Sequence, residues 1–158
     1  MKNNIKISLR NAVPSDIRKI FYLSNDPLVR LNSSVSTVIK WEEHKNWFTK
    51  KLKDINHLFL LFHFRDKLIG QVRYIVKNNE AEISISVHKR FRGKKISGKM
   101  LSLSQKVIIK EYPNVSKIKA TVKDFNEASQ KIFLNAGYLF KKSYIINKQK
   151  YFDFYLYL

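Results

Sequence analysis

Cysteine is absent from the 158 residues of the chain. Its absence excludes disulfide bonds, thiolate metal sites and catalysis through a protein thioester. Long apolar stretches are also missing. The longest, around residues 58–62, is far too short to cross a bilayer, and the initial MKNNIK has no hydrophobic signal core. We therefore expect a cytoplasmic protein with no membrane partner and no metal cofactor.

Proline and glycine are scarce, with three and four residues. Pro14, Pro27 and Pro113 each stand where an element should begin or end, and no repeat, low-complexity segment or Pro/Gly/Ser-rich linker divides the chain. A hydrophobic fraction of 44% is enough to bury a core at this length. The sequence thus predicts a single domain over residues 1–158.

Acidic residues are also few, since 12 Asp and Glu stand against 31 Lys and Arg, which gives a formal charge of +19. Such a charge suits a polyanionic partner. The basic residues are scattered, however, and no RNA-binding signature with interleaved aromatic residues is present. We interpret the charge as a solvated basic surface that can also steer a phosphate-bearing small ligand, and we do not expect a nucleic-acid partner.

Hydrophobic periodicity predicts an α/β (α+β) fold with the element order βααβββαβαββ. The predicted strands cover residues 5–10, 57–64, 68–76, 81–87, 117–122, 138–146 and 150–158. The predicted helices run from Pro14 to near Asn25, from about Lys40 to Asp54, from about Lys95 to Glu111, and from Glu127 to Asn135. A loop rich in Ser and Asn is expected between the first two helices.

Residues 81–101 read AEISISVHKRFRGKKISGKML and carry the clearest signal for a ligand. The alternation places Glu82, Ser84 and Ser86 on one face of the strand. A basic turn then opens a helix, and free amides at a helix N-terminus beside Lys and Arg side chains suit a pyrophosphate.

This strand, the RGKKIS turn and the segment NEASQKIFLNAGY at residues 126–138 resemble the GNAT superfamily of N-acetyltransferases, which transfer acetyl from acetyl-CoA to an amine. The resemblance covers nearly the whole chain. It implies acetyl-CoA as cosubstrate and direct transfer in a ternary complex. It also implies a three-layer fold with a mixed, mostly antiparallel seven-stranded sheet, splayed between the fourth and fifth strands where acetyl-CoA inserts.

The resemblance also assigns the cofactor site. The implied residues are Ser86, Val87 (through its main-chain amide), Arg92, Gly93, Lys94, Lys95, Ile96, Ser97, Gly98, Asn126, Ser129 and Phe133. The turn departs from the family pattern R/Q-x-x-G-x-G/A at two glycines. Ser97 is small, but Lys95 replaces a glycine that allows close backbone approach to phosphate, so we expect the loop to bend differently or to hold CoA less tightly.

Glu82 is the candidate general base, because it matches a frequent acidic position on this strand, although an exposed glutamate paired with lysine is an equally good interpretation. The usual general acid of the family is a tyrosine, and Phe133 occupies its position here. Water, Tyr74 or Tyr138 remain as alternative proton donors, with both tyrosines also fitting core or sheet positions.

The acceptor site is expected in the N-terminal third, with Asn25, Arg30, His44 and Arg73 as candidate substrate residues. The strings SNDPLVR, WEEHKNWF and GQVR are similar to acetyltransferases that act on nucleotide-linked amino sugars. The most similar ones acetylate the 4-amino group of a UDP-linked 4-amino-4,6-dideoxy sugar in the pathway to pseudaminic acid. NDPxVR also resembles acetyltransferases of ribosomal protein N-termini. Protein N-terminal or Lys acetylation, a non-catalytic acyl-CoA-binding module, and a homodimer formed through the last strand remain open.

Overall fold

The computed structural model describes residues 6–158. Ile5, where the first strand is predicted to begin, lies outside the described residues. The strands are β1 (Ile7–Asn11), β2 (His57–Phe64), β3 (Lys67–Lys77), β4 (Glu80–Val87), β5 (Lys117–Lys123), β6 (Leu139–Ile146) and β7 (Gln149–Tyr157). The helices are α1 (Ile17–Ser24), α2 (Pro27–Asn32), α3 (Trp41–Lys53), α4 (Ile96–Glu111) and α5 (Glu127–Asn135), with 3-10 turns η1 (Pro14–Asp16) and η2 (Lys89–Phe91).

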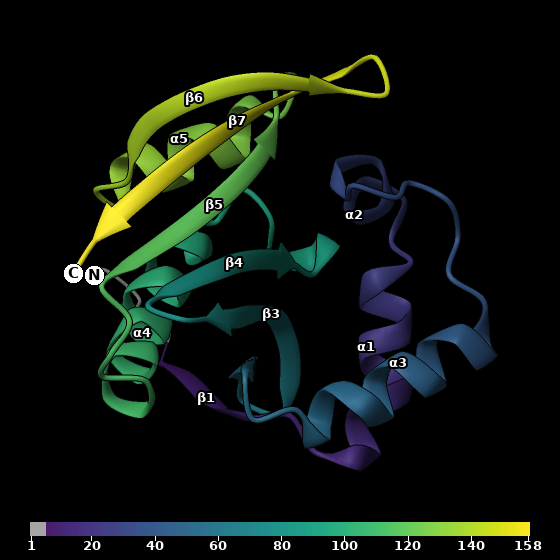
Figure 1. Ribbon diagram of the computed structural model, residues 1–158. Helices are drawn as coiled ribbons and strands as arrows, with labels where there is room; N and C mark the ends of the chain where they lie inside the picture. Colours follow the sequence, from purple (N-terminus) through teal and green to yellow (C-terminus); the bar gives the residue numbers. More distant parts are fainter. Residues whose placement is uncertain (1–5) are drawn as a thin grey trace.

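All seven strands form one sheet in the order β1-β2-β3-β4-β5-β7-β6 (Figure 1). Every neighbouring pair is antiparallel except β4 and β5, which are parallel. Residues 80–83 of β4 pair with residues 117–120 of β5, and the two strands separate beyond them. The predicted mixed, mostly antiparallel sheet and its splay between the fourth and fifth strands are therefore confirmed.

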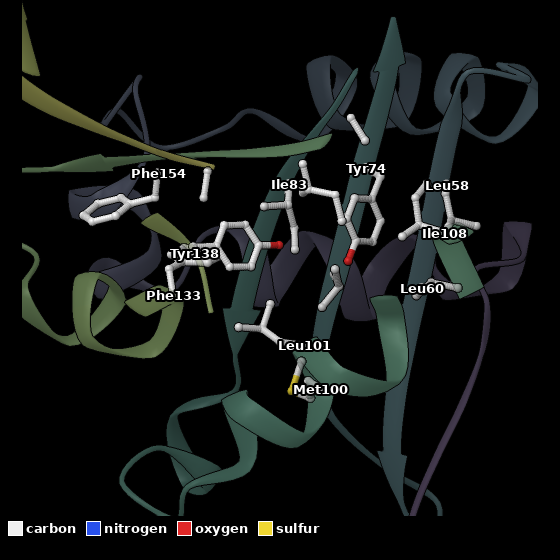
Figure 2. Close-up of a cluster of buried hydrophobic side chains, with 14 of the residues drawn as sticks. Leu58, Leu60, Tyr74, Ile83, Met100, Leu101, Ile108, Phe133, Tyr138 and Phe154 are labelled. Carbon is white, nitrogen blue, oxygen red and sulfur yellow. The ribbon is translucent and has the colours of Figure 1, made fainter. Parts of the chain in front are cut away.

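Helices cover the two faces of the sheet. On one face α4 and α5 bury the main core against β2 to β5 and β7, where Met100, Leu101, Phe133 and Tyr138 pack together (Figure 2). On the other face a smaller cluster joins Ile20 of α1 and Phe48 of α3 to β2. The sheet thus has one face packed on α4 and α5, and another that α1 and α3 cover over β2 to β4.

Helix α2 corrects the predicted loop. Asp26 and Pro27 were expected to end the first helix, and they also begin a second one. The Asp26 carboxylate accepts hydrogen bonds from the amides of Leu28 and Val29, at 3.1 and 3.3 Å. Proline at the first helical position has a suitable φ and lacks only an amide that would otherwise be unpaired. The same dipeptide therefore ends α1 and starts α2.

Candidate active site at the separated strands

The site lies where β4 and β5 part. We call residues 84–87 of β4 and residues 121–123 of β5 the fork. Ser84 and Ser86 alternate with the core residue Ile83, so they lie on the face opposite α4. Lys119 and Thr121 of β5 point to the same side as Glu82, because Glu82 and Lys119 are register partners. Hydroxyl and charged groups therefore line one face of the fork.

The turn after β4 and the start of α4 form a candidate anion site. Gly93 has φ 72°, and Lys95, the residue that caps α4, has φ 56° and ψ 24°. No side chain caps this end, so the first amides of a 16-residue helix remain available beside the lysine side chains. The loop does bend as a glycine would at position 95, and the lysine adopts the left-handed conformation itself.

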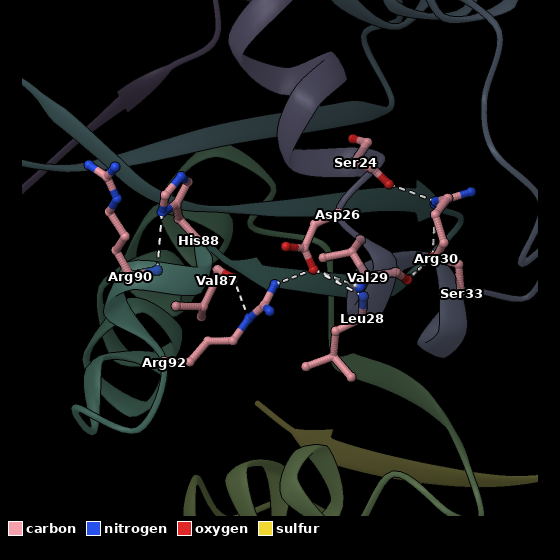
Figure 3. Close-up of polar contacts among 10 residues, drawn as sticks. All are labelled: Ser24, Asp26, Leu28, Val29, Arg30, Ser33, Val87, His88, Arg90 and Arg92. Carbon is pink, nitrogen blue, oxygen red and sulfur yellow. Dashed lines mark hydrogen bonds and ion pairs between the residues drawn. The ribbon is translucent and has the colours of Figure 1, made fainter.

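Arg92 connects this turn to α2. Its Nε donates to the Val87 carbonyl at 3.0 Å, and its Nη2 lies 2.6 Å from Oδ1 of Asp26 (Figure 3). Burial of Asp26 opposes its charge, but the hydrogen bonds from Arg92 and from the amides of α2 lower the pKa of this carboxyl. Two of the donor nitrogens of Arg92 are therefore engaged within the protein.

Lys123 ties the other end of α2 to β5. Its Nζ donates to the Leu31 carbonyl at 2.8 Å, and the residue is only 7% exposed. Helix α2 is thus held to the end of β4 at its start and to the end of β5 near its finish, and Figure 1 shows it beside the ends of both strands. Neither Asp26 nor Lys123 was among the predicted site residues, because only contacts between distant segments reveal them.

Two predicted substrate residues, Asn25 and Arg30, hold the segment 33–39. The Asn25 side chain exchanges hydrogen bonds with the backbone of Ile39, at 2.8 and 3.0 Å. Arg30 donates to the carbonyls of Ser24, at 2.6 Å, and Val35, at 3.1 Å. Burial lowers the pKa of Arg30, which has no carboxylate partner within residues 6–158. Both side chains shape the loop that borders α2.

His44 lies in the packing between α1 and α3. It is 1% exposed, its Nε2 is 2.9 Å from the Ile17 carbonyl, and its ring stacks on Phe48. Burial lowers its pKa, so the imidazole is neutral at pH 7. The structure thus places His44, a predicted substrate residue, in the buried packing between α1 and α3.

Arg73 lies on the same sheet face as the fork, opposite Ser84. Its guanidinium is half-buried and sits 5.1 Å from the Trp47 ring centroid and 5.7 Å from that of Phe59. Burial, followed by repulsion from Arg30, lowers its pKa to about 10, so it remains charged at pH 7. Within the described part of the chain no carboxylate or hydrogen-bond acceptor pairs with it.

Glu82 pairs with Lys119 at 3.1 Å, and its side chain is 52% exposed. The arrangement is the ion pair that the sequence left open, placed directly before the fork. A second carboxylate, Asp153 of β7, is buried on the same face, where its Oδ1 accepts from Thr121 at 2.8 Å and from the Tyr144 hydroxyl at 3.1 Å. From the sequence, Asp153 was assigned only to a strand. A single carboxylate among the aromatic residues of YFDFY could have indicated a buried polar group there.

The aromatic alternatives for a general acid are core residues. The Tyr74 hydroxyl bonds the Ser104 hydroxyl at 2.8 Å, and Tyr138 is 1% exposed, with its ring 5.0 Å from that of Phe133 (Figure 2). Burial raises the pKa of both tyrosines. Their hydroxyls are therefore poor proton donors to a leaving group.

The remaining predicted cofactor residues surround the start of α4 and of α5. Asn126 caps α5 by accepting from the Ser129 amide at 3.2 Å. Ile96 is buried in the main core, and Gly98 faces open space. Within residues 6–158 no cluster of three or more potential ligands could hold a metal ion. In the same residues no helix has the length and apolarity needed to cross a membrane.

A mixed sheet that separates between its one parallel pair of strands, with a basic turn at the start of the next helix, is the arrangement expected of an acyltransferase. The family model described as "Acetyltransferase (GNAT) domain" matches residues 6–139. The chain therefore belongs to the GNAT family and is an acetyl-CoA-dependent N-acetyltransferase. Among curated proteins, none matches the chain.

Solved structures share this fold at low identity. Spermidine N-acetyltransferase from Vibrio cholerae in complex with CoA and spermine is 19% identical, with a TM-score of 0.87 over 98% of this chain and 96% of that one. A dodecameric structure of the Vibrio cholerae enzyme is 20% identical, with a TM-score of 0.80 over 98% and 95%. RimL, a ribosomal L7/L12 alpha-N-protein acetyltransferase in complex with CoA, is 12% identical, with a TM-score of 0.84 over 96% and 94%.

Proposed function

We propose that the protein acetylates the amino group of a nucleotide-linked amino sugar, of the UDP-4-amino-4,6-dideoxy type, by direct transfer from acetyl-CoA in a ternary complex. One observation carries the proposal. Arg30, Arg73 and Lys123, all around α2 and the fork, have no carboxylate partner within the described residues. Unneutralised cations beside an acceptor site select for an anionic acceptor.

Charge argues against a polyamine acceptor. Spermidine and spermine, the acceptors of the Vibrio cholerae relatives, are cations at pH 7, and this chain carries a formal charge of +19. Repulsion of a polycation by such a field lowers both its rate of encounter and its affinity. The diphosphate of a nucleotide sugar is attracted instead, while the serine hydroxyls of the fork can bind sugar hydroxyls.

Each step of the transfer has a candidate group in the chain. The α4 amides with Lys94 and Lys95 hold the CoA pyrophosphate, and the Val87 amide polarises the thioester carbonyl. Glu82, acting through water, takes a proton from the acceptor amine as its nitrogen attacks the carbonyl carbon. CoA leaves as the thiolate and takes a proton from water, because Phe133 has no hydroxyl.

The acceptor is tested by measuring CoA release with a UDP-4-amino sugar, spermidine and an N-terminal peptide. We expect turnover of the nucleotide sugar alone. Arg73→Gln should raise its KM by roughly tenfold to a hundredfold, as expected for a lost charge-assisted contact, with a smaller change in kcat. Arg18→Gln, at an exposed position of α1, is the matched control. Turnover of the peptide but not of the sugar would establish the protein acetyltransferase instead.

Glu82→Gln tests the base. We expect turnover to fall about 10²- to 10⁴-fold, since general-base catalysis contributes that much, while calorimetric binding of acetyl-CoA is unchanged. Asp153→Asn gives the comparison with the buried carboxylate. Full turnover by Glu82→Gln at every pH would remove Glu82 from the mechanism, and binding without turnover of any amine by the unsubstituted protein would favour a non-catalytic module.

A further inference from the structure

Gln71 of β3 contains a buried polar atom without a partner. The residue is 1% exposed, and within the described part of the chain its side-chain oxygen Oε1 accepts no hydrogen bond. Folded proteins pair nearly all buried polar side-chain atoms, because an unpaired one loses its hydrogen bonds to water without replacement. An oxygen that the fold itself leaves unused is a candidate for contact with a ligand.

The register of the strands places Gln71 at the fork. Its partner on β4 is Ser86, and Arg73, two residues further along β3, is paired with Ser84 on the same face. Partner side chains of antiparallel strands have Cβ atoms about 4.5 to 5.5 Å apart. The Gln71 side chain therefore starts beside that of Ser86, the residue before Val87, whose amide is the candidate to polarise the thioester carbonyl.

Gln71 also lies where the apolar packing ends. Its partner on β2 is Leu61, which is 0% exposed and belongs to the cluster that Ile20 and Phe48 form with β2. Ser86, in contrast, is half-buried and carries a hydroxyl. An apolar residue would suit contact with Leu61 better than a glutamine does. A polar side chain at this position thus indicates a role at the fork rather than in the core.

We propose that Oε1 of Gln71 accepts a hydrogen bond from the attacking amino nitrogen of the acceptor. The nitrogen attacks the thioester carbonyl carbon through its lone pair, so its N–H groups remain free to donate. One proton passes through water to Glu82 as the carbon–nitrogen bond forms and the carbon–sulfur bond breaks. A second N–H donates to Gln71 and becomes the N–H of the product amide.

This hydrogen bond is strongest in the transition state. Positive charge develops on the nitrogen while its bond to carbon forms, and a hydrogen bond from a charged donor is about twice as strong as one between neutral groups. An interaction that strengthens in the transition state raises kcat. Glu82 lies four positions before Ser86 on β4, so the base acts through water and does not hold the nitrogen itself.

The role of Gln71 requires only that the acceptor is an amine. It rests on N-acetyl transfer, the activity of the family, and not on the nucleotide-linked sugar proposed above. A primary amine has a second N–H for Gln71, whereas a hydroxyl has a single hydrogen, which the base removes. Gln71 therefore favours nitrogen over oxygen as the nucleophile.

Gln71→Met tests the contact, because methionine keeps a long unbranched side chain and removes the oxygen. CoA release is measured with the UDP-4-amino sugar, spermidine and the N-terminal peptide. For each amine that the unsubstituted protein acetylates, we expect kcat to fall about tenfold to a hundredfold, with a smaller change in KM and unchanged calorimetric binding of acetyl-CoA. Gln105→Met, the same change at a half-buried glutamine of α4 on the other face of the sheet, is the matched control and should keep its kcat.

Thermal melting gives a readout that needs no acceptor. Replacement of an unpaired buried oxygen by an apolar group should raise the Tm of Gln71→Met by about 2 to 4 °C, although the same variant loses turnover. Gln71→Asn keeps a carboxamide but shortens the side chain, so it should lower kcat without this gain in stability. A residue with a purely structural role would lose stability and activity together.

Three outcomes are decisive. Full kcat for Gln71→Met with an amine that the unsubstituted protein acetylates overturns the inference. A lowered Tm also overturns it, because the amide is then paired in the free protein, for example with an ordered water, and this result holds even when none of the three amines is acetylated. Acetylation of spermidine or the peptide instead of the sugar refutes only the proposed acceptor, and Gln71 is then judged on that amine.

Discussion

Lys95 adopts a backbone conformation that suits glycine. With φ 56° and ψ 24° it lies in the left-handed region, where an L side chain crowds its own carbonyl. The family pattern has glycine here, and the structure explains that choice by conformation as well as by the close approach of phosphate. A lysine at position 95 strains the backbone more than a glycine would, but it places a second ammonium group beside Lys94.

Substitution of Lys95 separates these two effects. Lys95→Gly should stabilise the apo protein by about 1 kcal/mol through relief of the left-handed strain, and it should weaken acetyl-CoA binding at low salt through the lost charge. Lys94→Gly is the control, since Lys94 has no positive φ, and it should lower the melting temperature. Calorimetric titration and melting curves measure both. If the two variants change the melting temperature equally, Lys95 is not strained in its left-handed conformation.

His57 makes stability depend on pH. Burial, and then repulsion from Arg73 and Lys51, lowers its pKa from 6.5 to about 4. Between these values the unfolded chain binds more protons than the folded one, so stability is complete above pH 6.5 and falls by about 3 kcal/mol as pH decreases to 4. Urea denaturation across this range measures the loss.

The variant His57→Gln should flatten this pH dependence. Some slope remains, because burial lowers the pKa of His44 and His63 in the same direction. Asp16 and Asp26 have a pKa below 3.8, so loss of their charge destabilises the protein only at lower pH. A variant that loses stability as steeply as the parent between pH 6.5 and 4 would show that His57 is protonated in the folded state.

At the scale of elements, Gly70 sets how closely β3, β4 and α4 approach. A Cβ at this position would lie 2.5 Å from the Ser86 carbonyl oxygen and 2.6 Å from Cε of Met100. The backbone oxygen belongs to the fork, and Met100 is buried in α4. The absence of a side chain at Gly70 therefore allows the start of α4 to lie close against β3 and β4.

Gly70→Ala should destabilise the protein by about 1 to 3 kcal/mol through overpacking, and should weaken acetyl-CoA binding as α4 shifts. Gly98→Ala is its matched control, because a Cβ there meets nothing within 4 Å, and alanine in a helix should add roughly 0.5 to 1 kcal/mol. Urea denaturation compares the pair. A neutral Gly70→Ala would mean that the strands relax around the methyl group.

The strands and the four long helices could be predicted, because alternation and helical spacing are local properties of the sequence. Helix α2 could not be predicted, because an Asp-Pro pair such as Asp26-Pro27 is typical both of the end of one helix and of the beginning of another. The hydrogen-bond partners of the polar side chains could not be predicted from the sequence either. Asn25 and His44 bond to backbone carbonyls of segments 14 and 27 positions away, and Lys123 meets Leu31 across 92 positions.

At the scale of the whole molecule, the excess of cations acts at a distance. For an anionic nucleotide sugar, kcat/KM should fall as salt rises toward about 0.5 M, because the Debye length shrinks to a few ångströms and steering is lost. A neutral amine acceptor is the control and should show little dependence. A flat salt profile for the nucleotide sugar would mean that the +19 charge does not guide its acceptor.

Helix α2 also fixes the width of the opening between the ends of β4 and β5. The Asp26 carboxylate holds the end of β4 through Arg92, and Lys123 holds the end of β5 to Leu31, so the two strand ends are clamped to one rigid turn of chain. Wider separation of the strands requires one of these charge-assisted bonds to break. We expect an opening of fixed width to admit a linear thioester lengthwise, and to exclude branched or bulky acyl groups by their width rather than by their polarity.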